Sequence, residues 1–306
     1  MRSRRNGAAG VSVAVFGRFV SLAFILLIAA IAPSRGQQLP GPQGPQQGPF
    51  RRQLWLVPST VPGLAMQTTI LRPQGQGPFP LVVINHGSVA NADDRASVPR
   101  PEFEPVATWF VRHGYVAALP QRPGHGETGG PYLEDIVSCD NADYERAGLG
   151  AAASIASAVD YLTGQPFVRK TGVVLVGHSA GGWGALAAAS QSPRALQAVV
   201  NFAGGLGGHS YDEPNRNCAP ERLLDAAGTF GRTTRVPTLW LYAANDTYFD
   251  AALSNRMAEA FRRAGGVVEY HLLPSFGEDG HFLIFSPDAV PLWAPIVASF
   301  LRLPVP

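Results

Sequence analysis

Residues 172–184 constrain the fold more than any other stretch, and read G-V-V-L-V-G-H-S-A-G-G-W-G. Four apolar residues run into a turn with glycines two positions before and two positions after Ser179. A small-residue run rich in alanine follows at 183–189 and suits a helix. A Cβ at either glycine would collide with the adjoining strand or helix. The pattern predicts a strand, a sharp turn and a helix, with the Ser179 hydroxyl at the tip.

The pentapeptide G-x-S-x-G is weak evidence by itself, because a chain with 34 glycines produces it by chance. Its weight comes from the flanks, which supply a buried strand before the serine and a helix after it. The turn is therefore a hypothesis that the rest of the chain must support.

Composition and charge bound the class of protein. The 306 residues are 46% hydrophobic and 15% charged, which is typical of a globular α/β domain. Five of the 24 basic residues lie within residues 1–36, which hold no acidic residue, so 19 basic residues face 22 acidic ones in the rest. A weakly acidic domain with dispersed arginines excludes a nucleic-acid partner.

The N-terminus has the layout of a secretory signal, with a basic start, an apolar run at 19–32 and a small-residue exit. We expect cleavage after Gly36, because cleavage after Ala32 would place Pro33 first in the mature chain. The alternative is a retained anchor, but the apolar run is short for a span of ~20 residues. Residues 1–36 are thus predicted to be a signal peptide of a periplasmic or secreted protein, with no stable membrane span after processing.

Residues 37–52 form a Pro/Gly/Gln-rich linker by composition. The irregular glycine spacing excludes a collagen helix and predicts an extended, disordered tether. The remainder, 53–306, is predicted to be a single catalytic domain.

The core shows two kinds of apolar pattern. Alternating runs at 54–57 and 66–71 predict an opening hairpin. Continuous apolar runs predict further strands at 80–85, 115–119, 173–176, 196–202, 238–243 and 267–273. Helical periodicity predicts helices at 102–113, 148–162, 250–264 and 292–301. Strands that alternate with helices indicate an α/β fold with one mostly parallel sheet covered on both faces.

Two long connections, 124–147 and 204–235, read as irregular, and loops of this length tend to be functional. Each holds one of the two cysteines, Cys139 and Cys218. In an exported protein the pair favours a disulfide between the loops, although two free thiols are the alternative. No Cys-x-x-Cys or His-x-x-x-His spacing supplies metal ligands, so we expect neither a metal nor a cofactor.

A serine hydroxyl needs a base to take its proton, and the base needs an acid to fix its tautomer. In a sheet of this kind the partners follow later strands in the order serine, acid, histidine. Asp246 comes directly after the strand at 238–243, and His281 lies in the loop after the strand at 267–273. The sequence therefore predicts a triad of Ser179, Asp246 and His281.

Other acids and histidines fit the triad less well. Asp250 is expected in the first turn of the next helix, where an acid complements the helix dipole. His271 lies inside a predicted strand, and His178 occupies the variable place of the turn, so both are interpreted as structural. Glu278 and Asp279 are interpreted as solubilising residues of the loop.

The tetrahedral oxyanion of such a reaction needs two N–H donors. One is expected from the backbone of Ala180, directly after the serine. The other is expected from the backbone of Ser88, in the loop N-H-G-S at 85–88, where Gly87 allows close approach. The alternative for this loop is an ordinary tight turn.

The chain resembles the α/β-hydrolases, and more narrowly the dienelactone-hydrolase-related esterases, over about residues 54–303. The resemblance is carried by N-H-G-S at 85–88, R-P-G-H-G at 122–126, G-H-S-A-G-G at 177–182, N-D at 245–246 and D-G-H at 279–281. It implies an α/β-hydrolase fold and a hydrolase. Dienelactone hydrolases proper use a cysteine nucleophile, and Ser179 favours a general carboxylesterase instead. The resemblance also implies a structural turn at 122–126, so His125 stays outside the catalytic set.

These patterns predict an exported serine hydrolase that cleaves carboxylic esters of small molecules through an acyl-enzyme intermediate. The alternatives are a peptidase, a lipase or a perhydrolase on the same fold, or a catalytically silent binding protein. Aromatic residues near the predicted site are candidates for a substrate pocket. They are Trp183, Tyr248 and Phe249, with Tyr132 or Tyr211 from the long loops.

Overall fold

A computed structural model of the chain describes residues 39–304. The predicted signal peptide lies outside this range. Within it, no helix combines the length and the apolar character needed to cross a bilayer.

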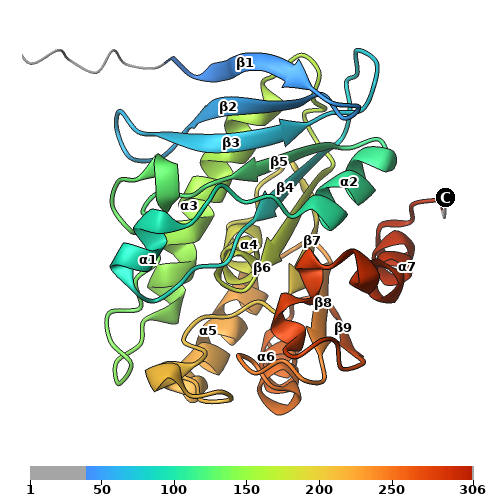
Figure 1. Ribbon diagram of the computed structural model, residues 1–306. Helices are drawn as coiled ribbons and strands as arrows, with labels where there is room; N and C mark the ends of the chain where they lie inside the picture. The colour runs from blue at the N-terminus through green and yellow to red at the C-terminus, as the bar shows by residue number, and fades with distance from the viewer. Residues whose placement is uncertain (1–38, 305–306) are drawn as a thin grey trace, which may run out of the picture. The chain divides into compact units, whose positions relative to one another are not determined.

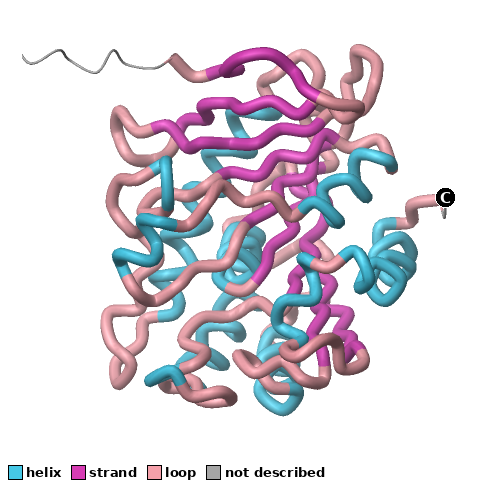
Figure 2. Tube along the Cα trace, viewed as in Figure 1, coloured by secondary structure: helices cyan, strands magenta, loops and turns pink. Residues whose placement is uncertain are grey.

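One nine-stranded sheet runs through the described part of the chain, in the order β1-β2-β3-β5-β4-β6-β7-β8-β9 (Figures 1 and 2). The three strands at one end pair antiparallel, and β3 also pairs antiparallel with β5. From β5 to β9 all neighbours are parallel. The strands are β1 Gly41–Gln47, β2 Arg52–Pro58, β3 Ala65–Leu71, β4 Leu81–Asn85, β5 Val116–Pro120, β6 Val173–His178, β7 Leu196–Phe202, β8 Thr238–Ala243 and β9 Val268–Leu273.

Helices cover both faces of the sheet (Figure 1). One core contains side chains of α3, α4, α5 and α6, and the other contains side chains of α2 and α7. The α-helices are α1 Ala92–Ser97, α2 Glu104–Arg112, α3 Tyr144–Thr163, α4 Ala180–Ser190, α5 Pro220–Thr233, α6 Ala251–Arg263 and α7 Val290–Leu301. Residues 39–304 also contain four short 3₁₀ turns, at η1 Gly126–Thr128, η2 Ser210–Asp212, η3 Gly280–Phe285 and η4 Pro287–Ala289.

Strand β4 shows why the central runs are apolar at every position. Leu81 and Val83 enter the core on one face, while Val82 and Ile84 enter the core on the other. Successive strand residues point to opposite faces, so a strand covered on both sides needs apolar residues throughout. This confirms the predicted mostly parallel sheet with helices on both faces. The antiparallel pairing of β2 with β3 confirms the predicted hairpin.

The predicted disordered tether at 37–52 is wrong for residues 41–47. These residues form β1, which pairs antiparallel with β2, as in the register of Gly41 with Leu56 and Gln47 with Arg52. The pairing shifts register between Gln43 and Gln47. An edge strand tolerates proline, because only one of its sides must supply ladder hydrogen bonds. Composition therefore misled the prediction, although the extended backbone was expected.

The connection at 204–235 is less irregular than predicted, because it contains α5 at Pro220–Thr233. Proline stands at the start of this helix, and Leu223, Ala227 and Phe230 are buried on one side. Proline at the first helical position followed by apolar residues at helical spacing is a helix signal that the sequence carries. The glycines inside the helix, Gly228 and Gly231, obscured it.

Candidate active site

The Ser179 turn has the predicted form. Strand β6 ends at His178, α4 begins at Ala180, and Ser179 between them has φ 53° and ψ −125°. A Cβ on Gly177 would lie 2.2 Å from the carbonyl oxygen of Gly181, so only glycine fits there. The strained backbone of a non-glycine residue at positive φ is held by packing on both sides. The half-buried Ser179 side chain is thereby presented at the tip of the turn.

Asp246 and His281 lie together, as their places after β8 and β9 predict. Nδ1 of His281 is 3.2 Å from Oδ1 and 3.1 Å from Oδ2 of Asp246, and both residues are buried. The carboxylate also accepts the backbone N–H groups of Tyr248 at 2.8 Å and Phe249 at 2.9 Å. Because a carboxylate accepts, Nδ1 carries the hydrogen and Nε2 keeps its lone pair.

His178, the residue before Ser179, connects the serine turn to His281. The His178 ring lies 4.7 Å from the His281 ring, and its Nε2 donates to the His281 carbonyl oxygen over 2.9 Å. Burial, and then the nearby His281, lower the pKa of His178 well below its usual value. His178 is therefore structural, as expected. Among residues 39–304, no hydrogen bond joins the Ser179 hydroxyl to His281.

The loop at 85–88 lies directly against the Ser179 turn. A Cβ on Gly87 would be 3.2 Å from Cβ of Ser179, and one on Gly181 would be 2.2 Å from the carbonyl oxygen of Asn85. The backbone N–H groups of Ser88 and Ala180 have no acceptor within the described chain. The structure thus places the loop that carries Ser88 beside the Ser179 turn, where Ala180 begins α4.

Other acids and histidines of the region make structural hydrogen bonds. Asp250 caps α6 by accepting the N–H of Leu253 over 2.8 Å, and His271 pairs with Glu269 over 2.7 Å at the surface. The interpretation of Asp279 as a solubilising residue is wrong. Its carboxylate accepts the N–H of His281 over 2.9 Å and the hydroxyl of Thr247 over 2.6 Å, and so joins the two loops that carry the acid and the histidine.

The model of the dienelactone hydrolase family matches residues 66–281 of this chain. That range is more than half of the chain and contains the Ser179 turn, Asp246, His281 and the loop at 85–88. The chain belongs to the dienelactone hydrolase family. Membership of this family identifies the protein as a hydrolase. No curated protein matches the chain.

Solved structures share the fold. A dienelactone hydrolase, described as putative, from Klebsiella pneumoniae is 18% identical with a TM-score of 0.58, over 82% of this chain and 98% of that one. The Pyrococcus furiosus esterase Pf2001 is 14% identical with a TM-score of 0.55, over 87% and 97%. An acylaminoacyl peptidase of Pyrococcus horikoshii is 14% identical with a TM-score of 0.61, over 84% of this chain but 42% of its own. These likenesses show the α/β-hydrolase fold alone.

The pocket predictions for this dienelactone hydrolase family member need correction at two positions. Trp183 is completely buried, its indole N–H donates to the Tyr144 carbonyl oxygen over 2.8 Å, and so it belongs to the core. Phe249 is 1% exposed and packs against Gly205. Because both rings are buried, neither offers surface to a substrate. The prediction went wrong because the sequence does not reveal which side of the turn each ring faces.

Tyr248 stays at the site. Its ring stacks on the His281 ring with centroids 4.1 Å apart, and the His209 ring stacks on Tyr248 at 3.6 Å. Tyr132 also lies at the site, with its hydroxyl 3.2 Å from the Ser88 hydroxyl. Tyr211 is 68% exposed and stacks under the guanidinium of Arg216 instead.

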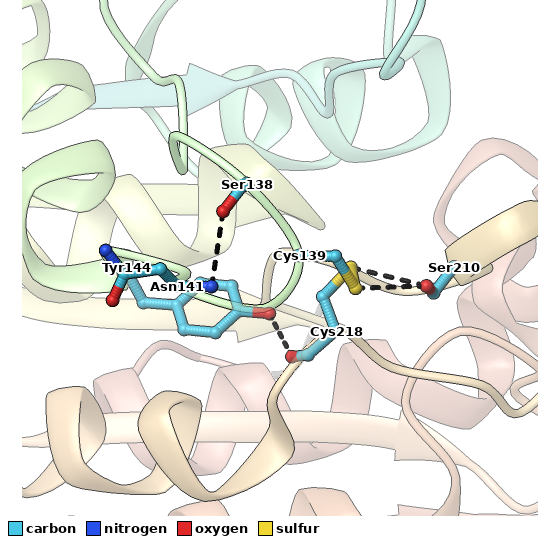
Figure 3. The surroundings of a disulfide bond; sticks show 6 residues. All are labelled: Ser138, Cys139, Asn141, Tyr144, Ser210 and Cys218. Carbon is cyan, nitrogen blue, oxygen red and sulfur yellow. Dashed lines mark hydrogen bonds between the residues drawn. A yellow bond between two sulfur atoms is a disulfide. The ribbon is translucent and has the colours of Figure 1, made fainter.

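The predicted disulfide between Cys139 and Cys218 is confirmed, with Cα atoms 4.8 Å apart (Figure 3). The Ser210 hydroxyl lies 3.3 Å from both sulfurs, and the Tyr144 hydroxyl donates to the Cys218 carbonyl oxygen. The bridge joins the two long connections. Within the described range, no group of three or more His, Cys, Asp or Glu residues could hold a metal ion.

Proposed function

We propose that this hydrolase is an exported serine esterase that cleaves carboxylic esters of small molecules. The observation that carries the proposal is the buried contact of Asp246 with His281 next to the strained Ser179 turn. A nucleophile, a base and an acid that orients the base are what acyl transfer through a covalent intermediate requires.

In the proposed cycle, Oγ of Ser179 attacks the ester carbonyl carbon while Nε2 of His281 takes its proton. Asp246 holds the imidazole in the Nδ1–H tautomer and stabilises the imidazolium. The N–H groups of Ser88 and Ala180 donate to the oxyanion of the tetrahedral intermediate. The C–O bond then breaks, and His281 protonates the leaving alcohol. His281 then takes a proton from water as the water oxygen attacks the acyl carbon, and it returns that proton to Oγ of Ser179 as the Ser179–acyl bond breaks, which releases the acid and the free serine.

The missing hydrogen bond between Ser179 and His281 is compatible with this cycle. In enzymes without bound substrate such bonds are often long and tighten in the complex. The Nε2 lone pair of His281 is not engaged by another group in the described chain, so it is available to the serine.

Export is proposed from the basic and apolar layout of residues 1–36 and is supported by the disulfide. Disulfides persist in oxidising compartments and are rare in the cytosol. Intact-mass measurement of the protein recovered from outside the cytoplasm tests this part, with loss of residues 1–36 as the expected result.

The direct test of the chemistry is replacement of the serine. Ser179→Ala is expected to reduce turnover of a p-nitrophenyl ester of a short acyl chain by about 10⁴-fold or more, because the nucleophile is lost. Ser97→Ala is the matched control, since Ser97 is an exposed serine on α1 and its loss should leave turnover unchanged. Undiminished turnover in Ser179→Ala would refute the assignment.

The peptidase alternative is tested in the same assay. An acyl-amino-acid anilide presents an amide with the same kind of leaving group, and we expect its kcat/KM to be far below that of the ester. A preference for the anilide would instead favour a peptidase, the activity that the Pyrococcus horikoshii protein is named for.

A further inference from the structure

The Ser88 side chain makes contacts that the proposed cycle does not use. Its hydroxyl lies 2.9 Å from Nε2 of His125 and 3.2 Å from the hydroxyl of Tyr132. Ser88 follows β4, whereas His125 and Tyr132 lie in the connection after β5. Two loops that are far apart in the sequence therefore meet at the residue that is proposed to supply an oxyanion donor.

The direction of these hydrogen bonds follows from the other side of the His125 ring. Nδ1 lies 3.2 Å from the carbonyl oxygens of Arg122 and Pro123, which only accept. Nδ1 therefore carries the hydrogen, and Nε2 accepts the Ser88 hydroxyl proton. Tyr132 in turn donates to Oγ of Ser88. The burial of His125 lowers the pKa of its imidazole, which keeps the ring neutral and Nε2 an acceptor.

His125 is itself held rigidly. Its ring is 1% exposed and meets the His86 ring edge-on, with centroids 4.6 Å apart. The connection that carries it is fixed by a buried, bidentate ion pair between Arg122 and Glu134, with N–O distances of 2.5 and 2.8 Å. Two parallel charge-assisted hydrogen bonds give such a pair a defined geometry and tie position 122 to position 134.

The peptide that contains the Ser88 N–H is anchored from its other end. Nδ1 of His86 donates to the Gly87 carbonyl oxygen over 2.6 Å, and Nε2 of His86 accepts the N–H of Arg122 over 3.0 Å. The carbonyl of Gly87 and the N–H of Ser88 belong to one trans peptide and point in opposite directions. The Ser88 N–H therefore points away from the side on which His86 holds the Gly87 carbonyl, and it has no acceptor within residues 39–304.

We propose that His125 and Tyr132 are positioning residues that hold the Ser88 hydroxyl and thereby aim the Ser88 N–H at the developing oxyanion. This inference rests on the proposed esterase function. It assigns to His125, which the sequence resemblance treats as part of a structural turn, an effect on the transition state. The residues touch neither the substrate nor the reacting atoms, and they act through Ser88.

The test begins with steady-state kinetics on a chromogenic ester. His125→Ala is expected to lower kcat by about 10- to 100-fold, because a misplaced oxyanion donor weakens transition-state binding. KM is expected to stay within about threefold, since the interaction is made only in the transition state. His125→Gln keeps an acceptor near the position of Nε2 and should recover part of the loss. Tyr132→Phe should give a smaller decrease in kcat.

A double-mutant cycle separates this role from general loss of packing. Ser88→Ala keeps the N–H but loses the anchored hydroxyl, so its effect should resemble that of His125→Ala. The double variant Ser88→Ala with His125→Ala should lose no more than the stronger single variant, because both remove the same hydrogen bond. A trifluoromethyl ketone forms a bound adduct that carries an oxyanion. Its affinity for each variant should fall in proportion to the loss in kcat/KM.

The control is His271→Ala, which removes a surface histidine of β9 and should leave kcat and KM unchanged. Thermal unfolding establishes that each variant is folded; if His125→Ala does not fold, Ser88→Ala and Tyr132→Phe carry the same comparison. Wild-type kcat in the folded variants, additive losses in the double variant, or a loss confined to KM would overturn the inference. A wild-type protein that hydrolyses no ester would instead contradict the proposed function itself.

Discussion

Ser179 and the two glycines around it set the geometry on which the proposed chemistry depends. The serine backbone lies at a positive φ of 53°, which a residue with a side chain adopts only when its surroundings enforce it. Gly177 lets the end of β6 lie close to the first turn of α4, and Gly181 lets that turn lie close to the loop at 85–88, each more closely than a Cβ would permit.

Gly181→Ala tests this close approach. The new Cβ would lie 2.2 Å from the carbonyl oxygen of Asn85 and 2.4 Å from that of His86, so the turn and the oxyanion loop must separate. We expect a loss of unfolding free energy of about 1–3 kcal/mol and a fall in ester turnover of at least about 10-fold. Urea unfolding and steady-state kinetics measure the two effects.

The matched control is Gly228→Ala. Gly228 lies inside α5, and its nearest atom to a new Cβ is the Ala260 carbonyl oxygen at an ordinary 3.7 Å. This change should stabilise the protein by about 0.5–1 kcal/mol and leave turnover intact. Equal effects of the two substitutions would contradict the close-approach argument.

The sequence was sufficient to predict that Asp246 and His281 meet. Asp246 follows β8, His281 follows β9, and these two strands are parallel neighbours in the sheet. It was not sufficient for Asp279 or His125. Their partners, Thr247 and Ser88, lie 32 and 37 residues away on loops whose paths no local pattern encodes. The sequence also does not show which way a side chain on α4 points. Trp183 was therefore predicted to line a pocket, although its side chain is buried in the core.

At the scale of elements, the strands and helices with strong periodicity were predictable, and those with conflicting composition were not. Strand β1 is rich in proline and glycine, and it exists because β2 offers an edge to pair with. Helix α5 buries one face against its neighbours despite two internal glycines. In both cases tertiary contacts outweigh local propensity.

The disulfide is the covalent link between the two long connections, and its removal should act mainly on stability. Cys139 and Cys218 are separated by 79 residues, and closing a loop of this size stabilises a protein by about 4 kcal/mol in the chain-entropy view. The double variant Cys139→Ser with Cys218→Ser should therefore unfold at lower urea concentration, with a loss of about 2–5 kcal/mol.

Wild-type protein reduced with dithiothreitol is the control, and it should unfold together with the double variant. Coincident unfolding curves of the double variant and the oxidised wild type would show that the bridge does not stabilise the fold.

At the scale of the whole molecule, the fold lowers the pKa of three buried histidines. Burial is the largest cause that lowers the pKa of His86, His125 and His178. In the unfolded chain each returns to about 6.5. Below that pH the unfolded state binds more protons than the folded state, so the free energy of unfolding must fall as the pH falls.

We expect this loss of stability to begin near pH 6.5 and to continue as the pH falls toward the lowered folded-state values. Each histidine contributes up to about 1.4 kcal/mol per pH unit, or about 4 kcal/mol per pH unit for the three together. Urea unfolding at pH 7.5, 6.5 and 5.5 measures the slope, and His125→Gln should reduce it by about one third. Stability that stays level or rises between pH 6.5 and 5.5 would contradict the burial of neutral histidines.

The central claim is that Ser179 is an activated nucleophile, and covalent labelling tests it most directly. A fluorophosphonate reacts with a serine only when a base and an oxyanion site activate it. Peptide mass mapping of the treated protein is expected to find one adduct, on Ser179, which disappears in Ser179→Ala and is strongly slowed in His281→Ala. A folded wild-type protein that remains unlabelled, or an adduct on a different serine, would contradict the account.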